Sequence, residues 1–205
     1  MTDAGSGAAA ERSAPRLLIA EDEAIIRLDL KEMLEEEGYA VVGEAADGEA
    51  ALRLAREQSP DLVIMDVKMP GMDGLTAAGK IVDEQLGAVL ILTAFSQRDL
   101  VQRAAEAGAM GYLVKPFQKS DLMPAIDIAL ARHAQLSAVR GESANLSEQL
   151  ATRKAVDKAK GRLMDGQGMS EADAFRHIQK RAMNERRSMR AVADEIADEA
   201  GSSPN

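Results

Sequence analysis

The 205-residue chain contains no cysteine and only two histidines, His133 and His177. Without cysteine the protein cannot form disulfides, use a thiolate nucleophile or hold a cysteine-ligated zinc or iron–sulfur centre, and this composition is typical of a reducing compartment. Two histidines leave little room for an imidazole-rich metal centre. The longest apolar run, Ala88 to Leu92, is far shorter than the ~20 residues that cross a membrane. These absences predict a soluble, cytoplasmic protein.

The N-terminal residues 1–14 carry neither a basic segment nor an apolar stretch ahead of Pro15. A secretory signal needs such segments, so none is expected. Small and polar side chains bury too little apolar surface to offset the entropy of ordering, and we therefore expect 1–14 to form a disordered tail.

Basic charge is scarce overall and unevenly distributed. The chain has 25 Lys and Arg against 34 Asp and Glu, a formal net charge of -9. Residues 1–150 hold 14 basic and 25 acidic side chains, whereas residues 151–190 hold 11 basic and five acidic ones. Phosphate binding requires a basic surface. The net acidity therefore does not exclude a nucleic-acid partner for the second part of the chain.

Short apolar segments alternate with amphipathic segments over the first 130 residues. The first amphipathic segment has Ile25, Leu28, Leu30, Met33 and Leu34 as its apolar positions. The pattern predicts an α/β fold with a five-stranded, doubly wound parallel sheet. The expected strands are 16–20, 39–42, 62–65, 88–92 and 110–114, and the expected helices are 25–37, 48–58, 74–85, 97–107 and one that begins at 119.

Polar side chains stand directly after four of these strands. Glu21 and Asp22 follow the first, Asp66 the third, Thr93 the fourth and Lys115 the fifth. A single aspartate in such a place is more often a helix cap than a reactive group, but the carboxyl ends of parallel strands converge on one crevice. Carboxylate oxygens there are suited to Mg2+, and the central Asp66 is suited to accept a phosphoryl group. Lys115 would neutralise the phosphoryl oxygens and Thr93 would donate to one of them.

Four sequence motifs in this region resemble the receiver domain of two-component response regulators. They are IAEDE (19–23), LVIMDVKMPGMDG (62–74), LTAF (92–95) and GYLVKPF (111–117). The resemblance covers about residues 16–132, and we take 15–132 as the domain. It implies a flavodoxin-like fold whose Asp66 is phosphorylated by a sensor histidine kinase.

The resemblance also assigns roles to single residues. It implies that Asp22, Asp66 and the main-chain carbonyl of Lys68 coordinate Mg2+, with Glu21 acting more indirectly. It further implies that Thr93 and Lys115 contact the phosphoryl group. Tyr112 is then the aromatic residue whose rotamer reports activation.

From Asp121 onward the apolar residues keep a spacing of three to four, through Leu136, Val139, Leu146 and Leu150. This spacing predicts a long helix that leaves the first domain and pairs with another helix. We expect a helical linker or coiled coil over 133–150, with Gly141 as a point where the helix could break. His133 is expected to be a seam or surface residue.

Residues 151–200 read as a small all-α domain of three helices. The first ends near Met164, the second is capped by Ser170 and the third follows Ser188. Its apolar positions, and so its expected core, are Val156, Ala159, Leu163, Ala174, Phe175, Ile178, Ala182, Met183, Met189, Val192, Ile196 and Ala197. Phe175 in particular is expected in the core rather than on a base-stacking surface.

This segment resembles the ANTAR domain, an RNA-binding output module of response regulators. The motifs are AKGRLM (159–164), GMSEADAF (168–175) and AMNERRSMRAVA (182–193). The resemblance implies that phosphorylation drives homodimerisation through the helical region. It also implies binding to paired RNA hairpins and transcription antitermination. The expected RNA contacts are Arg153, Lys158, Lys160, Arg176, Lys180 and Arg181.

Two other functions fit the same residues. Ser170–Val192 could form a helix-turn-helix that binds DNA, although Asn184–Ser188 is a poor short turn of the glycine type. Alternatively, the helical tail could bind a protein partner and no nucleic acid. An independent enzyme is not expected, because the Asp66 site handles only its own phosphoryl group, up to autodephosphorylation.

Overall fold

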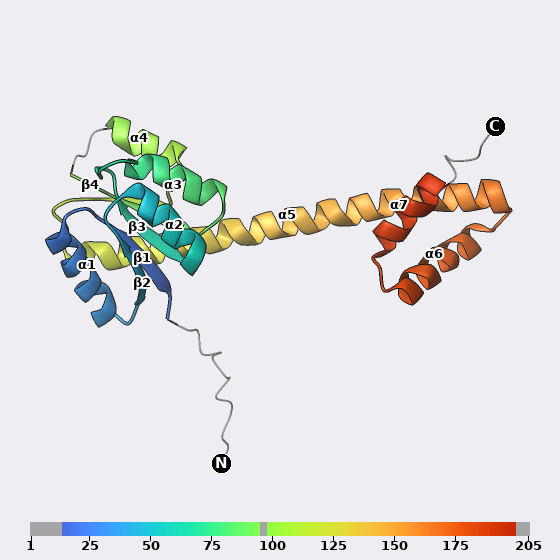
Figure 1. Cartoon of the computed structure of the whole chain (residues 1–205), viewed down its shortest axis with the longest axis horizontal. Coiled ribbons are helices and arrows are strands. Elements are labelled where there is room, and N and C mark those ends of the chain that lie inside the picture. Colours follow the sequence, from blue (N-terminus) through green and yellow to red (C-terminus); the bar gives the residue numbers. More distant parts are fainter. Residues whose placement is uncertain (1–13, 95–97, 200–205) are drawn as a thin grey trace, which may run out of the picture. The chain divides into compact units, whose positions relative to one another are not determined.

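The computed structural model describes residues 14–94 and 98–199, which fall into two compact units divided after Leu136 (Figure 1). All but the last residue of the predicted tail 1–14 lies outside the described residues, as do Phe95 of the LTAF motif and the first residue of the predicted helix 97–107. Each unit has its own hydrophobic core.

The first unit contains a parallel five-stranded sheet, as the alternating pattern predicted. Its strand order is β2-β1-β3-β4-β5, with β1 paired to both β2 and β3. The second strand begins and ends later than expected because its pairing with β1 runs from Arg16↔Ala40 to Ala20↔Ala45. The strands are β1 Arg16–Ala20, β2 Ala40–Ala45, β3 Leu62–Asp66, β4 Ala88–Thr93 and β5 Gly111–Val114.

Helices cover both faces of the sheet, as a doubly wound fold requires (Figure 1). Helices α1 (Ala24–Glu36) and α5, which begins at Lys119, pack on one face, where Leu30, Leu34 and Ile126 are buried. The other face is covered by α2 (Gly48–Gln58), α3 (Gly74–Asp83) and α4 (Arg98–Glu106). β3 is buried along its whole length, which explains its continuous apolar sequence.

Two residues of the expected apolar face of α1 are not in the core. Leu30 and Leu34 are fully buried, whereas Ile25 is 84% exposed and Leu28 is 55% exposed. At 100° per residue, Ile25 and Leu28 lie on the side of the helix opposite to Leu30. The first unit therefore presents large apolar side chains at the start of α1.

α5 is one continuous helix from Lys119 to Gln167, 49 residues long. It passes Gly141 without interruption, so the break allowed for at this glycine is absent. Residues 134–150 of the helix are all exposed. Within the described part of the chain, neither α5 nor any other helix is long and apolar enough to cross a membrane.

The second unit is the three-helix domain expected from the sequence. The last turns of α5 pack against α6 (Glu171–Glu185) and α7 (Met189–Glu199). The Ser170 hydroxyl caps α6 by accepting from the Asp173 N–H at 3.2 Å. The core residues are Ala155, Val156, Ala159, Leu163, Ala174, Ile178, Ala182, Val192, Ala193 and Ile196.

Phe175 and Met183 are not part of this core, contrary to expectation. The buried stripe of α6 is Ala174, Ile178 and Ala182, and its two alanines let the neighbouring helices come close. At 100° per residue, Phe175 lies just beside the stripe, next to the direction of Ala182, whereas Met183 lies on the side of the helix opposite to Ala174. They are 42% and 73% exposed.

Gly74, the first residue of α3, touches the backbone of the sheet. A Cβ atom at this position would lie 1.8 Å from the main-chain oxygen of Asp66. Gly79 in the same helix would meet nothing within 4 Å. We expect Gly74→Ala to lower the free energy of unfolding by about 3 kcal/mol, because the loop after β3 must shift.

Gly79→Ala is the matched control for this substitution. It should raise the free energy of unfolding by about 0.5–1 kcal/mol, because alanine is the better helix former. Urea unfolding followed by circular dichroism measures both variants. Equal stabilities of the two variants would show that the approach of α3 to Asp66 is looser than the structure has it.

Candidate functional site

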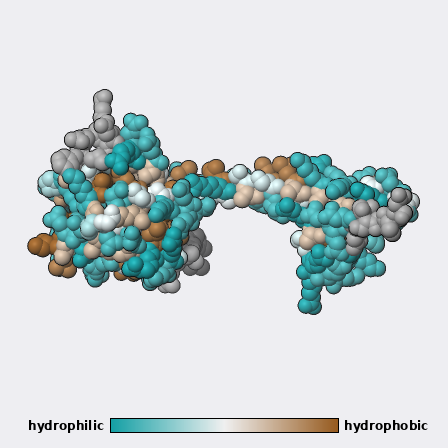
Figure 2. Space-filling view, turned by 45° about the horizontal axis from the view of Figure 1, so that its top comes forward, coloured by the Kyte–Doolittle hydropathy of each residue, from teal (hydrophilic) through white to brown (hydrophobic). Residues whose placement is uncertain are grey.

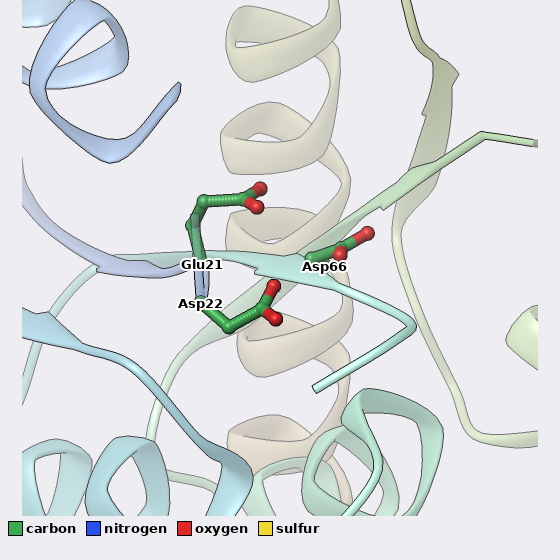
Figure 3. Close-up of side chains that lie close together, drawn as sticks. All are labelled: Glu21, Asp22 and Asp66. Atoms are coloured by element: carbon green, nitrogen blue, oxygen red, sulfur yellow. The ribbon is translucent and has the colours of Figure 1, made fainter. Parts of the chain in front are cut away.

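The polar residues expected at the strand ends are brought together at the carboxyl edge of the sheet. Glu21 and Asp22 follow β1, and Asp66 is the last residue of β3. Figure 3 shows these three side chains projecting from neighbouring strand ends. One carboxylate oxygen from each lies within 4.8 Å of the others. The strand order, in which β1 pairs with β3, thus brings carboxylates that are far apart in the sequence close together.

Asp66 lies at the wall of a cavity of about 220 Å³. Its side chain is 10% exposed, and its Oδ1 accepts from the Val67 N–H at 2.9 Å. The carboxylate is thus oriented by the backbone and still reachable through the cavity. The residues that line this cavity are Asp22, Glu23, Asp66, Val67, Lys68, Thr93, Ala94 and Lys115.

Lys115 supplies the ammonium group that pairs with the buried carboxylates of the site. Its Nζ lies 2.6 Å from Glu21 Oε2 and 3.4 Å from Asp66 Oδ1. The Glu21 side chain is fully buried, and the Lys115 side chain is 14% exposed. The Lys115 N–H donates to the Thr93 carbonyl at 2.8 Å, and the bond between Lys115 and Pro116 is cis. A single ammonium group therefore serves two buried carboxylates.

Burial dominates the protonation of both carboxylates. It raises the pKa of Glu21 above its usual value of 4.5, against the lowering effect of Lys115. Burial likewise raises the pKa of Asp66 above 3.8, and Lys115 again opposes the shift. A second positive charge in the cavity would therefore favour the ionised state of both groups.

The donor set fits a divalent cation such as Mg2+. Glu21, Asp22 and Asp66 offer hard carboxylate oxygens, and Asp22 is exposed to the cavity side where water can complete the coordination. Lys68 lines the same cavity, as its expected role as a main-chain ligand requires. Three carboxylates lie close together beside Lys115, and a bound cation would reduce the repulsion between them.

Not every expected residue lies at this cavity. Tyr112 is on β5, 47% exposed, and does not line it. Glu23, which the motif included without a role, does line it. Arg27 was missed: its guanidinium donates to the Glu21 carbonyl at 2.5 Å and pairs with Glu44 at 3.6 Å. Its position one turn into α1 was the only signal in the sequence.

The expected RNA contacts of the second unit differ in how firmly they are paired. Lys160 is held by Asp157 and Glu171, both at 2.8 Å, and its side chain is 17% exposed. Arg181 pairs with Glu185 at 2.8 Å and with Glu195. Arg153 is 83% exposed and 4.0 Å from Asp157. Of the other three, Lys158 lies 3.9 Å from Asp198, Arg176 lies 2.7 Å from Asp173, and Lys180 is exposed.

Three basic residues outside the expected set are better placed for an external anion. Lys154, Arg162 and Arg186 are exposed and, like Lys180, form no ion pair with another residue that the structure describes. Lys154, Lys158 and Arg162 follow one another at intervals of four on α5 and so share one face. Lys160 and Arg181 are instead each paired with two acids, which a count of charges in the sequence does not show.

Known proteins resemble both units. Residues 17–127 match the response regulator receiver domain family, and residues 144–196 match the ANTAR domain family. The transcriptional regulatory protein PdtaR of Mycobacterium tuberculosis is 56% identical over 186 residues, which cover 91% of each chain.

Solved structures resemble the first unit. The signal receiver domain of the response regulator NarL from Mycobacterium tuberculosis is 30% identical, has a TM-score of 0.56 and covers 58% of this chain and 98% of its own. The CheX–CheY–BeF3–Mg complex from Borrelia burgdorferi provides a chain that is 26% identical, with a TM-score of 0.52. The match covers 54% of this chain and 85% of that one.

The Lys115–Glu21 pair can be tested by removing the ammonium group. Without added divalent cation, Lys115→Met should lower the free energy of unfolding at neutral pH by about 3–5 kcal/mol, because it leaves a buried carboxylate unpaired. A raised pKa means that the folded state holds the proton more tightly, so stability is recovered as the pH falls through that pKa. The loss should therefore shrink as the pH falls toward the usual carboxyl value of 4.5.

Glu21→Gln in the Lys115→Met background is the matched control. Because the amide carries no charge, most of the lost stability should return at neutral pH. Urea unfolding at several pH values measures each variant. A loss in Lys115→Met that is the same at acid and neutral pH would contradict the importance of this charge pair.

Proposed function

Because this chain belongs to the two-component response regulators that join a receiver domain to an ANTAR domain, we propose that a sensor histidine kinase phosphorylates Asp66 and thereby controls an RNA-binding output domain. The chain is a transcriptional regulator similar to PdtaR. The proposed output is binding of RNA hairpins that prevents formation of a terminator, which is transcription antitermination.

The observation that carries the proposal is the position of Asp66. Its carboxylate lies at a cavity with Lys115 Nζ 3.4 Å away and Thr93 in the lining. An Asp66 oxygen can attack the phosphorus of a phosphohistidine, so that an O–P bond forms as the N–P bond breaks and the imidazole nitrogen leaves with the electron pair. Lys115 and the Thr93 hydroxyl are placed to stabilise the phosphoryl oxygens during this transfer.

We assign Mg2+ as the cofactor, held by Asp22, Asp66 and the Lys68 main-chain carbonyl, with Glu21 behind them. When bound, the ion would supply positive charge to the phosphoryl oxygens. The carboxylate cluster and the Mg2+ in the solved CheY complex support this assignment. Burial raises the pKa of Asp66 and Lys115 opposes this shift, so the charge of a bound cation would further favour the ionised carboxylate that attacks the phosphorus.

The histidine kinase must place its phosphohistidine at the Asp66 cavity. Ile25 and Leu28 at the start of α1 are exposed apolar side chains, and α1 follows directly after Glu21 and Asp22. Exposed apolar side chains beside a charged site are suited to contact a protein partner. We propose no enzymatic activity beyond phosphoryl acceptance and autodephosphorylation.

Phosphorylation would shift an existing conformational equilibrium rather than create a new state. Thr93 is buried at the end of β4 and Tyr112 is exposed on the neighbouring β5. A movement of Thr93 toward the phosphoryl group would leave space that Tyr112 can enter. The proposed domain limits are 15–132 for the receiver, 133–150 for the linker and 151–200 for the RNA-binding domain.

The functional test combines labelling with RNA binding. A small phosphoryl donor with Mg2+ should label the wild-type chain and tighten its binding to hairpin RNA by about 5- to 150-fold, the usual range of coupling between two sites. Asp66→Asn should do neither, whereas Asp83→Asn, which changes an exposed acid of α3, should do both. Filter binding at one fixed salt concentration measures the affinities.

Three outcomes of this experiment would contradict the proposal. Labelling that persists in Asp66→Asn would identify another phosphoacceptor. Tighter binding of duplex DNA would favour the helix-turn-helix function, which the three-residue connection between α6 and α7 permits. Binding of neither nucleic acid by the phosphorylated chain would favour a protein-interaction output.

We further propose that phosphorylation drives a homodimer through α5. Val139, Leu146 and Leu150 are exposed at intervals of seven and four, which forms an apolar seam (Figure 2). Leu136, one turn earlier, is exposed as well. Such a seam is stabilised when it packs against the same seam of a second helix.

Changes in this seam should separate dimerisation from folding. Leu146→Glu combined with Leu150→Glu should weaken the phosphorylated dimer at least 100-fold, roughly the loss of two buried leucines on each helix. Ala144→Glu, on the other side of α5, should leave the dimer intact. Sedimentation equilibrium measures both, and a dimer that survives the double substitution would place the interface elsewhere.

A further inference from the structure

Phe175 is the only aromatic residue after Phe117, and it stays partly in solvent. Its neighbour Ala174 is fully buried, whereas the Phe175 side chain is 42% exposed. Phe175 is the fifth residue of α6, and it shares a hollow with side chains of α5 between Glu148 and Lys160. An exposed phenyl ring at the edge of a packed core is the kind of surface that a ligand covers.

The ring lines a hollow of about 410 Å³ between α5, α6 and α7, which we name the Phe175 hollow. Val156 and Met189 supply the rest of its apolar lining, and Gln149 and Thr152 add an amide and a hydroxyl group. Its volume is in the range of small-molecule sites, ~300–1,000 Å³. A hollow lined by an aromatic ring, apolar side chains and a few hydrogen-bonding groups is suited to bind a planar heterocycle.

We propose that the Phe175 hollow binds one unstacked nucleobase of the RNA hairpin loop, stacked against the phenyl ring. The proposal rests on the RNA binding proposed above and adds the site that reads the loop. Single-stranded loops are recognised by stacking their bases on aromatic side chains and by hydrogen bonds to their edges. Every base has a π-face, so stacking on Phe175 provides affinity, and Gln149 and Thr152 can contact the base edge.

Two acids, Glu148 and Asp157, also line the hollow, and each is held by a basic side chain, Arg190 at 2.6 Å and Lys160 at 2.8 Å. Arg153 and the basic residues beside it therefore provide the exposed charge that favours RNA over a protein side chain. The Arg153 side chain lines the hollow and is 83% exposed, so its guanidinium can follow a phosphate beside the bound base. Lys154 and Lys158, the next basic residues on α5, extend the positive charge away from the hollow. Lys160, in contrast, is held by two carboxylates and forms part of the wall.

Substitutions at Phe175 test the stacking. Phe175→Ala and Phe175→Leu should both weaken binding of the phosphorylated full chain to hairpin RNA by about 5- to 150-fold, the range for one stacked base. Phe175→Tyr should bind as the wild type does, because it keeps the ring. Met183→Ala, which removes another exposed apolar side chain of α6, is the matched control and should have no effect.

A fluorescent reporter detects the base directly. The chain contains no tryptophan, so Phe175→Trp provides a single indole in the hollow and Met183→Trp provides one outside it. Hairpin RNA should quench the fluorescence of Phe175→Trp and not that of Met183→Trp. Replacement of the loop bases by abasic linkers, one position at a time, should remove the quenching at one position only.

The outcomes distinguish this proposal from the function on which it rests. If the wild-type chain binds no hairpin RNA, RNA binding itself is wrong. If it binds RNA and Phe175→Leu binds equally well, or if every abasic loop still quenches Phe175→Trp, the nucleobase site is wrong and RNA binding stands. If Phe175→Ala instead changes the sedimentation of the chain without RNA, the hollow is a protein contact and the proposal is overturned.

Discussion

The ammonium group of Lys115 balances the carboxylates at the end of the sheet, and the chemistry of the first domain depends on this balance. Glu21 is fully buried with its carboxylate 2.6 Å from Lys115, and Asp66 lies 3.4 Å from the same group. Lys115 does not cancel the effect of burial, since the pKa values of both Glu21 and Asp66 remain raised. The site is thus arranged to gain from a further cation, and Mg2+ is the ion that its oxygen ligands suit.

The sheet and its reactive edge could be predicted from the sequence because both follow from short-range patterns and one topological rule. Continuous apolar strands such as 62–65 have a single stable place, between two layers of helices. The carboxyl ends of parallel strands then meet, which brings Asp22, Asp66 and Lys115 into one cavity. The tertiary role of Arg27 could not be predicted, because its position one turn into α1 does not by itself distinguish it from other surface arginines.

The burial of apolar side chains that border the buried face of a helix was harder to predict from the sequence. Ile25, Phe175 and Met183 are apolar and stand close to buried positions in the sequence, yet each is exposed. Helical periodicity locates a stripe to within about one residue, and small residues such as Ala174 and Ala182 decide where the contact is closest. Pairing of charges has the same limit: the sequence shows how many basic residues 151–190 contains, but only the structure shows that Lys160 is held by two acids.

The helix α5 carries the exposed seam and also forms part of the core of the second unit. The helix contributes Leu122, Ile126 and Ala129 to one core and Ala155, Val156, Ala159 and Leu163 to the other. Residues 134–150 between them are all exposed. A helical stretch without tertiary packing is only marginally stable in water, and this stretch carries Val139, Leu146 and Leu150 outward. Packing of the seam against a second copy would order the helix that leads directly into the core of the second unit. The proposed dimerisation and the proposed RNA binding would then be linked through the stability of one helix.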